Sequence, residues 1–325
     1  MFVNEGIHKL IWATSMQLSD RIGRRIKLQD LHVLMTVVQA GSMGKAARQL
    51  NAAQPNISKS IADLEHSLGV SLLDRHQHGV EPTAFGHALL DRCIAVFDEL
   101  RQGIKNIEHL ADPTMGEVRI GATGPLAEGF VSSVVDRLSR QYPRIVFHIE
   151  SRDVDRLHRE LHERTLDFLV VPKSPAATDE RVNLEVLFSD VYVVAAGPQH
   201  WAARRRKISL AELVDESWAM PLPGAMAASV ANQAFRASRV DLPRAAVFAR
   251  PEVRMSLVTT GRFLSIFSEA RLLFAPSPLK VLPVELPAAA VPNGIVTLKN
   301  RSLSPVAELF IDAARKIARP LTKKK

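Results

Sequence analysis

The sequence has only one cysteine and no long apolar run. A single cysteine, Cys93, excludes a framework of internal disulfides. No uninterrupted apolar stretch approaches the ~20 residues that a helix needs to span a bilayer. The first 25 residues lack the continuous apolar core and the small-residue cleavage pattern of a signal peptide. These absences predict a cytoplasmic protein without a membrane partner.

The sequence also lacks the motifs that carry the commonest enzyme chemistries. It contains no phosphate-binding Gly-rich loop, no nucleophile elbow and no Cys-x-x-Cys pair. His158 and His162 lie one helical turn apart, but their order, His-Arg-Glu-Leu-His, is not His-Glu-x-x-His, and no third ligand is evident. We therefore expect these histidines on a solvated helix face. We predict no catalytic residue, no metal site and no cofactor.

The positive charge of the chain does not by itself locate a nucleic-acid site. With 325 residues, 46% hydrophobic and 23% charged, the sequence is typical of a globular protein of two or three domains. Its net charge is +8, yet residues 1–112 hold 12 basic and 12 acidic side chains. Residues 113–325 hold 30 and 22, and so carry the whole excess. The case for DNA binding must therefore rest on pattern.

An early segment of the chain has the pattern of three helices. Apolar side chains recur at helical spacing over residues 28–38, and Gly41 is suited to end that helix. Ser42 is a candidate N-cap for a short second helix, and residues 51–53 form a tight turn. Pro55 then stands in the first turn of a third helix, where its missing N–H costs nothing. The apolar stripe of this third helix consists of Ile57, Ile61, Leu64 and Leu68.

The opposite face of the third helix begins with polar side chains, Gln54, Asn56 and Lys59. A helix-turn-helix reads DNA by placing its second helix in the major groove, with that helix's N-terminal residues toward the bases. Asn or Gln can bind adenine through two hydrogen bonds, and Lys suits guanine or phosphate. Residues 70–83 have short apolar pieces around a His-Gln-His-Gly tip, which predicts a β-hairpin wing.

Over residues 34–86 the sequence resembles the DNA-binding domain of the LysR-type transcriptional regulators. The matching residues are Gly41-Ser42-Met43, Ala46-Ala47, Leu50, Gln54-Pro55, Ser58, Ile61, Leu64-Glu65, Leu68-Gly69-Val70, Leu72-Leu73, Arg75, Gly79-Val80, Thr83 and Gly86. Ala53, His78 and Pro82 depart from the family pattern, which often has a Ser or Thr cap, an Arg and an aliphatic residue there. The residues expected to contact DNA are Ser42, Gln54, Pro55, Asn56, Ser58, Lys59, Arg75 and His78.

From Thr83 to Leu110 no proline interrupts the sequence, and apolar residues repeat every three or four positions. Such a heptad seam is the pattern of two helices packed together. The family resemblance implies a linker helix that dimerises. Cys93 falls on the seam and is interpreted as a small buried apolar residue rather than a redox group. The expected seam consists of Leu90, Cys93, Phe97, Leu100, Ile104 and Ile107.

In the remaining two thirds, expected strands alternate with expected helices, which is typical of βαβ units and a mainly parallel sheet. The first lobe is expected to contain strands at 118–121, 145–149 and 168–171, a helix ending near Tyr142 and a helix at 154–161. The second is expected to contain strands at 184–196, 218–220 and 263–267 and a helix at 227–239. A Pro-rich loop with a short edge strand (275–292), a strand returning to the first lobe (296–298) and a closing helix (305–317) follow.

This part resembles the two-lobed effector domain of the same family, which is similar in fold to periplasmic binding proteins. The clearest matches are Gly116–Gly121, Tyr142-Pro143, Leu166-Asp167 and Leu210–Leu213 before Trp218. In open α/β sheets, ligands bind beyond the carboxyl ends of strands, near helix N-termini. Residues 171–173 are expected to leave the third strand as a crossover to the second lobe. The candidate effector-binding residues are Thr123, Gly124, Pro125, Asp153, Pro172, Leu222, Gly224 and Phe267, with plain turn residues as the alternative.

The predicted fold class is an α+β multidomain protein. Its expected parts are an unmatched extension (1–26), a winged helix-turn-helix (27–86), a linker and dimerisation helix (87–113) and a two-lobed α/β effector domain (114–318) similar to periplasmic binding proteins. Lobe I is expected to cover about 114–172 and 283–318, and lobe II about 173–282.

The expected function is ligand-responsive regulation of transcription. The expected partners are double-stranded promoter DNA, a small-molecule effector, further copies of the chain in a homodimer or tetramer, and RNA polymerase. An enzyme with an accessory DNA-binding domain is the alternative, against which the missing catalytic motifs argue. A solute-binding protein is a third possibility, which residues 28–110 and the missing signal peptide disfavour.

Overall fold

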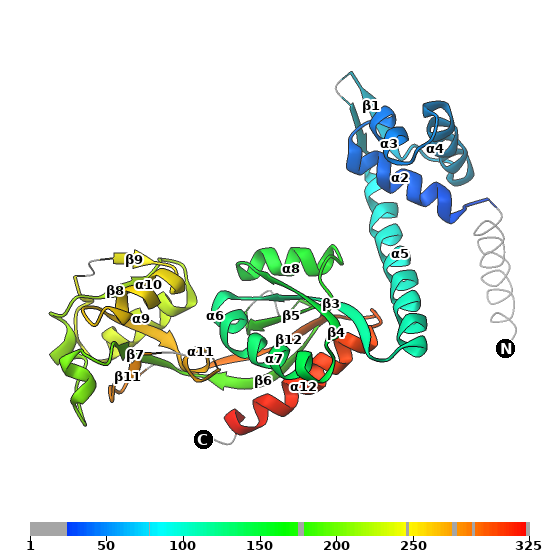
Figure 1. Cartoon of the computed structure of the whole chain (residues 1–325). Helices are drawn as coiled ribbons and strands as arrows, with labels where there is room; N and C mark the ends of the chain where they lie inside the picture. The colour runs from blue at the N-terminus through cyan, green and yellow to red at the C-terminus, as the bar shows by residue number, and fades with distance from the viewer. Residues whose placement is uncertain are drawn as a thin grey trace, which may run out of the picture. The chain divides into compact units, whose positions relative to one another are not determined.

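The structure is a computed structural model and describes residues 25–77, 79–174, 179–244, 247–274, 278–287 and 290–322. The chain divides into two units, one ending at Leu100 and the other beginning at Arg101. The N-terminal unit contains helices and a hairpin (Figure 1). The C-terminal unit contains two lobes, each built around its own sheet.

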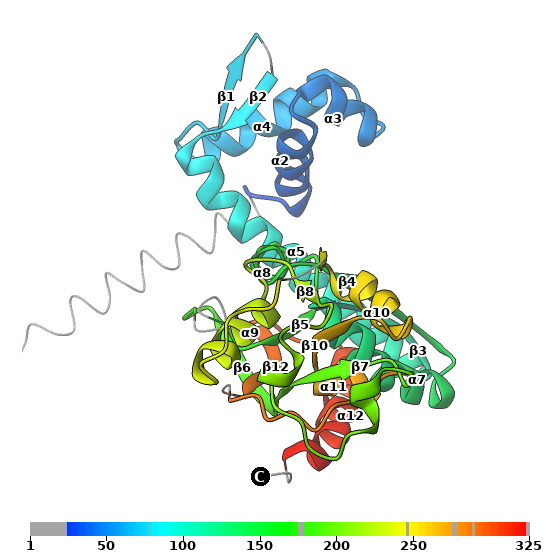
Figure 2. The same ribbon diagram turned by 90° about the vertical axis from the view of Figure 1, so that its left-hand side faces the viewer.

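The N-terminal unit has the three helices and the wing that the sequence predicts. Its elements are α2 (Leu28–Ala40), α3 (Met43–Gln49), α4 (Gln54–Leu68), β1 (Leu73–His76) and β2 (Gly79–Pro82). Gly41 ends α2 in the left-handed region, at φ 68°. The three helices share one apolar core, and Leu34, Ile61 and Leu64 are fully buried in it. The antiparallel β1–β2 hairpin projects beyond this core (Figure 2).

Helix α5 (Ala84–Ala111) begins directly after the wing, and Gly86 in its first turn leaves no space for a side chain. A Cβ atom at Gly86 would overlap the carbonyl oxygen of Leu72 and lie 3.1 Å from the Cβ of Pro82. Leu89 and Leu90 pack against the core of the three helices. The first turns of α5 are therefore part of the fold of the N-terminal unit.

Lobe I is built on a five-stranded sheet in the order β4-β3-β5-β12-β6. The strands are β3 (Met115–Ala122), β4 (Arg144–Ser151), β5 (Phe168–Pro172), β6 (Val182–Asp190) and β12 (Val291–Leu298). Strands β3, β4 and β5 run parallel, as predicted, and β12 is antiparallel to both β5 and β6. The expected return of the chain to the first lobe near residue 296 is thus confirmed.

Helices cover both faces of the lobe I sheet (Figure 1). The helices are α6 (Gly124–Leu126), the π-helical turn η1 (Ala127–Val131), α7 (Ser132–Gln141), α8 (Val154–His162) and α12 (Pro305–Thr322). On one face α7 and α12 enclose an aromatic core with Phe130, Phe168 and Phe310. On the other face Leu157 and Leu161 of α8 pack against the sheet.

Lobe II contains a three-stranded sheet, β10-β7-β11, and a parallel pair, β8 and β9, joined to it by a bridge between Trp218 and Leu264. The strands are β7 (Tyr192–Ala196), β8 (Ala219–Pro221), β9 (Val247–Ala249), β10 (Leu264–Ser268) and β11 (Lys280–Val281). The helices are α9 (Met226–Ala237), α10 (Pro251–Thr259), α11 (Glu269–Phe274) and the short turns η3 (Trp201–Arg204) and η4 (Ala211–Leu213). Trp218, fully buried, packs edge-on against Phe235 of α9.

One strand assignment from the sequence is wrong. The apolar stretch 184–196 was expected as a single strand of the second lobe, but the structure has β6 and β7, which belong to different sheets. Asp190 marks the division, because its buried carboxylate accepts hydrogen bonds from the Ser268 hydroxyl and, at 3.0 Å, from the Ala270 N–H. The chain therefore crosses between the lobes next to Asp190, and not at residues 171–173 as expected.

Candidate DNA-binding surface and effector site

The α3–turn–α4 segment is fixed by local backbone chemistry. Ser42 has extended backbone angles, and its Oγ accepts a hydrogen bond from the Lys45 N–H at 3.1 Å, which confirms it as the N-cap of α3. Asn51 takes a left-handed conformation in the turn, at φ 49°. Ala53, the N-cap of α4, offers no capping side chain, and Pro55 lies in the first turn.

The first turn and a half of α4 present polar side chains to solvent. Gln54, Asn56 and Lys59 are exposed, as is Pro55, whereas Ser58 is half-buried. Asn56 and Lys59 border a hollow of about 440 Å³ that Asp30 and His32 of α2 also line. The Asp30 carboxylate accepts a hydrogen bond from Ser60 at 2.6 Å, which ties α4 to α2. Five of the predicted contact residues, Gln54, Pro55, Asn56, Ser58 and Lys59, therefore lie at the N-terminal end of α4.

The wing is anchored by contacts that the sequence pattern did not reveal. The Glu65 carboxylate accepts hydrogen bonds from the backbone N–H groups of Leu72, at 2.7 Å, and Leu73, at 3.2 Å. The Val80 N–H donates to the carbonyl oxygen of Gly41 at 3.0 Å, so the hairpin is tied to the turn before α3. Arg75 is exposed on β1. His78, the other wing residue expected to contact DNA, lies outside the described residues.

The apolar seam of α5 has two parts with different surroundings. Leu90 packs on the domain core, Cys93 is 1% exposed, and the Phe97 ring lies 5.8 Å from that of His32. Burial raises the pKa of the Cys93 thiol to about 11, so the thiol is protonated at neutral pH. The later seam residues are open to solvent in the single chain: Leu100 is 46%, Ile104 57% and Ile107 69% exposed.

The loop after β3 lies where the two lobes meet. Thr123 is half-buried, and its side chain makes no capping hydrogen bond to α6. A Cβ atom at Gly124 would lie 3.8 Å from the Ser151 Oγ in lobe I and 3.9 Å from the Glu252 Oε1 in lobe II. Residues of both lobes therefore surround the Thr123–Pro125 loop.

The other candidate effector residues differ in how far they are exposed to solvent. Asp153 is the exposed N-cap of α8, and Leu222 and Gly224 are exposed in the turn after β8. Pro172 is buried at the end of β5, where it pairs with Asn293 of β12. Phe267 is only 1% exposed. In this arrangement of the lobes, solvent reaches Asp153, Leu222 and Gly224 fully and Thr123 partly. Pro172 and Phe267 are buried.

Two arginines near Phe267 were missed by sequence reasoning. Arg271 of α11 donates from Nε to the Glu128 carboxylate of η1 at 2.6 Å, which links lobe II to lobe I. Arg254 of α10 is 3% exposed, although arginine is rarely buried. The sequence feature that could have indicated the burial of Arg254 is its spacing. Arg254 stands four residues before Val258, so both side chains lie on the same, buried face of α10.

The histidines of α8 are not both solvated, as the sequence suggested. His158 is 5% exposed, because it follows Leu157 on the buried side of the helix, and neither ring nitrogen has a hydrogen-bond partner. Burial lowers the pKa of His158 and keeps it neutral. His162 is half-buried, with its Nε2 3.7 Å from the Asp179 carboxylate. In the described ranges, no three potential metal ligands come together.

The N-terminal unit is a helix-turn-helix in which the start of α4 is polar and exposed, and a long helix and a two-lobed α/β unit follow it. These features together define a helix-turn-helix regulator that carries a separate ligand-binding domain. Comparison with known families agrees. Residues 28–87 match the model of the bacterial regulatory helix-turn-helix protein, lysR family, and residues 111–319 match the LysR substrate binding domain. The chain belongs to the LysR family of transcriptional regulators.

Individual relatives span nearly the whole chain. The HTH-type transcriptional regulator GbpR of Azospirillum brasilense is 28% identical over 297 residues, which cover 90% of this chain and 86% of GbpR. A full-length variant of OxyR from Pseudomonas aeruginosa has a similar fold, with a TM-score of 0.63, 20% identity, and coverage of 92% of this chain and 99% of OxyR. Full-length CbnR in complex with its target DNA gives a TM-score of 0.51 at 19% identity, covering 90% and 100% of the two chains.

Among the residues that the structure describes, no helix combines the length and the apolar character that crossing a membrane requires.

Proposed function

We propose that this protein binds promoter DNA as a homodimer or tetramer, and that a small molecule held between the lobes of residues 114–318 controls the outcome. The winged helix-turn-helix of residues 27–86 would contact DNA, and the helix of residues 87–113 would join two copies. The protein would act in the cytoplasm, together with RNA polymerase. The effector would be bound and released unchanged, so its quantitative recovery after incubation with the protein tests the distinction from an enzyme.

The observation that carries the DNA-binding proposal is the exposed polar start of α4. Gln54, Asn56 and Lys59 stand there beside an apolar stripe that fixes the helix on its own domain. Ser42 and Ser58 flank this surface, and Arg75 and His78 would extend it along the wing.

Replacing Asn56 by alanine is expected to weaken binding to the native site by ~1–3 kcal/mol and to relax base preference, if Asn56 binds a base edge. Replacing Lys59 should weaken binding to all sequences and reduce the slope of log K against log salt by about 1, because one phosphate contact is lost. Fluorescence anisotropy with labelled operator DNA measures both. His66→Ala, at the exposed far end of α4, is the matched control. Wild-type affinity and base preference in both variants would contradict the assignment of α4.

Replacing Thr123 by valine is expected to leave DNA affinity unchanged and to weaken the effector response. The hydroxyl of Thr123 has no capping role, so its loss should affect the ligand more than the fold. One neutral hydrogen bond contributes ~0.5–1.5 kcal/mol, and one to a charged ligand group ~1.5–3 kcal/mol. A thermal-shift screen of small carboxylates, aromatics and sugars on the full chain would supply the ligand for calorimetric titration. Equal ligand affinities of the two proteins would place the effector elsewhere.

A further inference from the structure

The net positive charge of the chain is carried mainly by lobe II and not by the helices that are expected to read DNA. Residues 27–86, the winged helix-turn-helix, hold five basic and five acidic side chains. Residues 191–282 of lobe II hold 12 basic and 6 acidic side chains, a net +6 of the +8 of the whole chain. Neutralisation of phosphates by Lys and Arg supplies a large share of the affinity of proteins for DNA. The winged helix-turn-helix alone has no excess of this charge.

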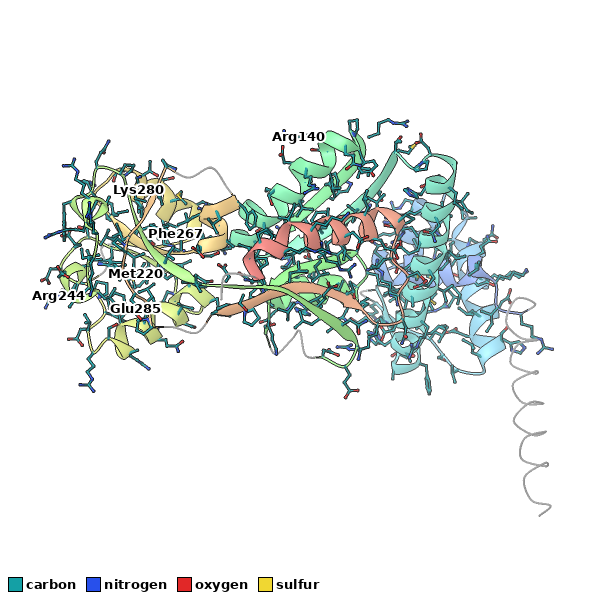
Figure 3. The ribbon with its side chains drawn as sticks, turned by 90° about the horizontal axis from the view of Figure 1, so that it is seen from below. Arg140, Met220, Arg244, Phe267, Lys280 and Glu285 are labelled. Atoms are coloured by element: carbon teal, nitrogen blue, oxygen red, sulfur yellow. The ribbon has the colours of Figure 1, made fainter. Side chains whose placement is uncertain are left out.

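The basic side chains of lobe II lie on its surface and have no carboxylate partner. Two of the 12 are buried. None of the ten exposed ones is in an ion pair with any described residue, including Arg244 and Lys280, which Figure 3 labels on lobe II. In lobe I, by contrast, several exposed arginines are paired with a carboxylate, among them Arg140, Arg152 and Arg156. The exposed charge of lobe II is therefore available to an anionic partner.

Four of these basic side chains are consecutive, Arg204-Arg205-Arg206-Lys207, and are called here the 204–207 segment. All four are exposed, although the core of lobe II fixes the chain on both sides of them. Ala202 before the segment is fully buried, and Ile208 after it is 4% exposed. The Arg205 N–H also donates to the Ala202 carbonyl oxygen at 3.1 Å. Four positive charges are therefore exposed on a short segment that is anchored at each end.

An aromatic ring, and not a carboxylate, holds one of these cations. The Cζ of Arg205 lies 5.5 Å from the centroid of the Trp201 ring, which is 41% exposed. The Trp201 Nε1–H donates to the Glu216 carboxylate at 2.8 Å, which fixes the ring. A guanidinium that lies over a ring keeps N–H donors free, and such donors can bind a phosphate through two hydrogen bonds. The ring therefore positions Arg205 without neutralising it.

Three acidic side chains follow the 204–207 segment, and two of them are engaged by other groups. Glu212 accepts hydrogen bonds from the Ser209 N–H and hydroxyl, each at 2.8 Å. These bonds, and more weakly the charge of Arg205, lower the pKa of Glu212. Glu216 holds Trp201 and also lies 3.5 Å from the His200 Nε2, and Asp215 is exposed. The carboxylates reduce the local positive charge without pairing with any cation of the segment.

We propose that the 204–207 segment is a second DNA-contacting surface, which binds the phosphate backbone of the duplex held by α4. The inference rests on the proposed binding of DNA and adds a contact outside the winged helix-turn-helix. Because both surfaces belong to one chain, the second contact forms within an existing complex, where even weak contacts add to the affinity. Duplex DNA fits the segment better than an acidic protein does, because it carries one charge per ~1.7 Å of helix axis.

Contacts to phosphate carry no direct sequence information, so the 204–207 segment should raise the affinity for every duplex alike. Fluorescence anisotropy of the full chain with the DNA upstream of its own gene and with a scrambled duplex, over a salt series, tests this. Replacing all four residues by glutamine should reduce the slope of log K against log salt by ~1.8 or more, because at least two phosphate contacts are lost. Affinity at ~0.1 M salt should fall at least ~10-fold for both duplexes.

The matched control removes the same charge from lobe I. It replaces four exposed residues by glutamine, none of them in an ion pair with a described residue: Arg137, Arg159, Lys299 and Lys316. The control variant should keep the wild-type slope and affinity, because its net charge changes equally but the 204–207 segment is intact. Circular dichroism checks that both variants fold. If the segment variant does not, Arg206→Gln with Lys207→Gln leaves the Arg205–Trp201 contact in place and should reduce the slope by ~0.9 or more.

A wild-type slope in a folded segment variant, or an equal reduction of the slope in that variant and the control, would overturn the inference. A wild-type slope together with lost binding to polyglutamate would overturn it in favour of an acidic protein partner. Equal affinity of wild type for the two duplexes would contradict the proposed function, whereas the slopes on the scrambled duplex would still decide the role of the segment. No binding of wild type to either duplex would overturn both.

Discussion

Replacing Ile104 by glutamate should yield a folded but dissociated protein that binds operator DNA weakly. Ile104 is 57% exposed in the single chain, so the fold of one chain does not depend on it. On the proposed seam it would face the same helix of a second copy, where burying an aliphatic side chain contributes ~1.5–3 kcal/mol. A glutamate there would be buried without a partner, at a cost of several kcal/mol per ion.

Sedimentation equilibrium at micromolar concentrations measures this effect. Wild type should sediment as a dimer or tetramer, and Ile104→Glu as a monomer with unchanged circular dichroism. Asn106→Glu is the matched control, because Asn106 is exposed on the same helix and lies off the seam, so its oligomeric state should equal that of wild type. A monomeric wild type, or an Ile104→Glu protein with the wild-type mass, would show that α5 is not the dimer seam.

Replacing Gly86 by alanine should destabilise the DNA-binding unit by ~3 kcal/mol, at the upper end of what overpacking usually costs. The new methyl group would overlap the Leu72 carbonyl oxygen, and neither α5 nor the start of the wing can move without disturbing the other. Gly103 of the same helix is the matched control, because a Cβ there would meet nothing within 4 Å. Gly103→Ala should stabilise α5 by ~0.5–1 kcal/mol, the usual gain for alanine over glycine in a helix.

Urea unfolding followed by circular dichroism gives both changes, with the transition of the N-terminal unit resolved from that of the lobes. Gly86→Ala should lower the midpoint of the first transition, and Gly103→Ala should not. Operator binding by Gly86→Ala should be lost at temperatures where the wild type still binds. Equal midpoints in the two variants would mean that the close packing of α5 against the wing does not contribute to stability.

The N-terminal unit could be predicted almost completely because its signals are local. Gly41 and Pro55 mark where helices end and begin, and one apolar stripe gives the extent of α4, observed as Gln54–Leu68. The seam of α5 shows the limit of periodicity. A repeating apolar stripe predicts a helix, but it cannot distinguish packing of Leu90 and Phe97 on their own domain from packing against a second copy.

The second lobe was less predictable, because its elements are short and its strands change sheets. Helix α11 has six residues and β9 three, too few for a periodic pattern to emerge. The run from Leu184 to Ala196 is apolar on both sides of Asp190, and composition cannot show that the two halves pair with different strands. Burial of Arg254 and Phe267 depends on how α10 and α11 pack against β10. No local sequence pattern encodes this packing.

The protein is proposed to bind promoter DNA sequence-specifically through α4 and the wing. Its most direct test is fluorescence anisotropy of the purified full chain with the DNA upstream of its own gene and with a scrambled duplex of equal length, over a series of salt concentrations. The protein should bind the upstream DNA at least ~10³-fold more tightly than the scrambled duplex. Its affinity for both duplexes should fall as the salt concentration rises. Equal affinity for the two duplexes, or no binding to either, would contradict it.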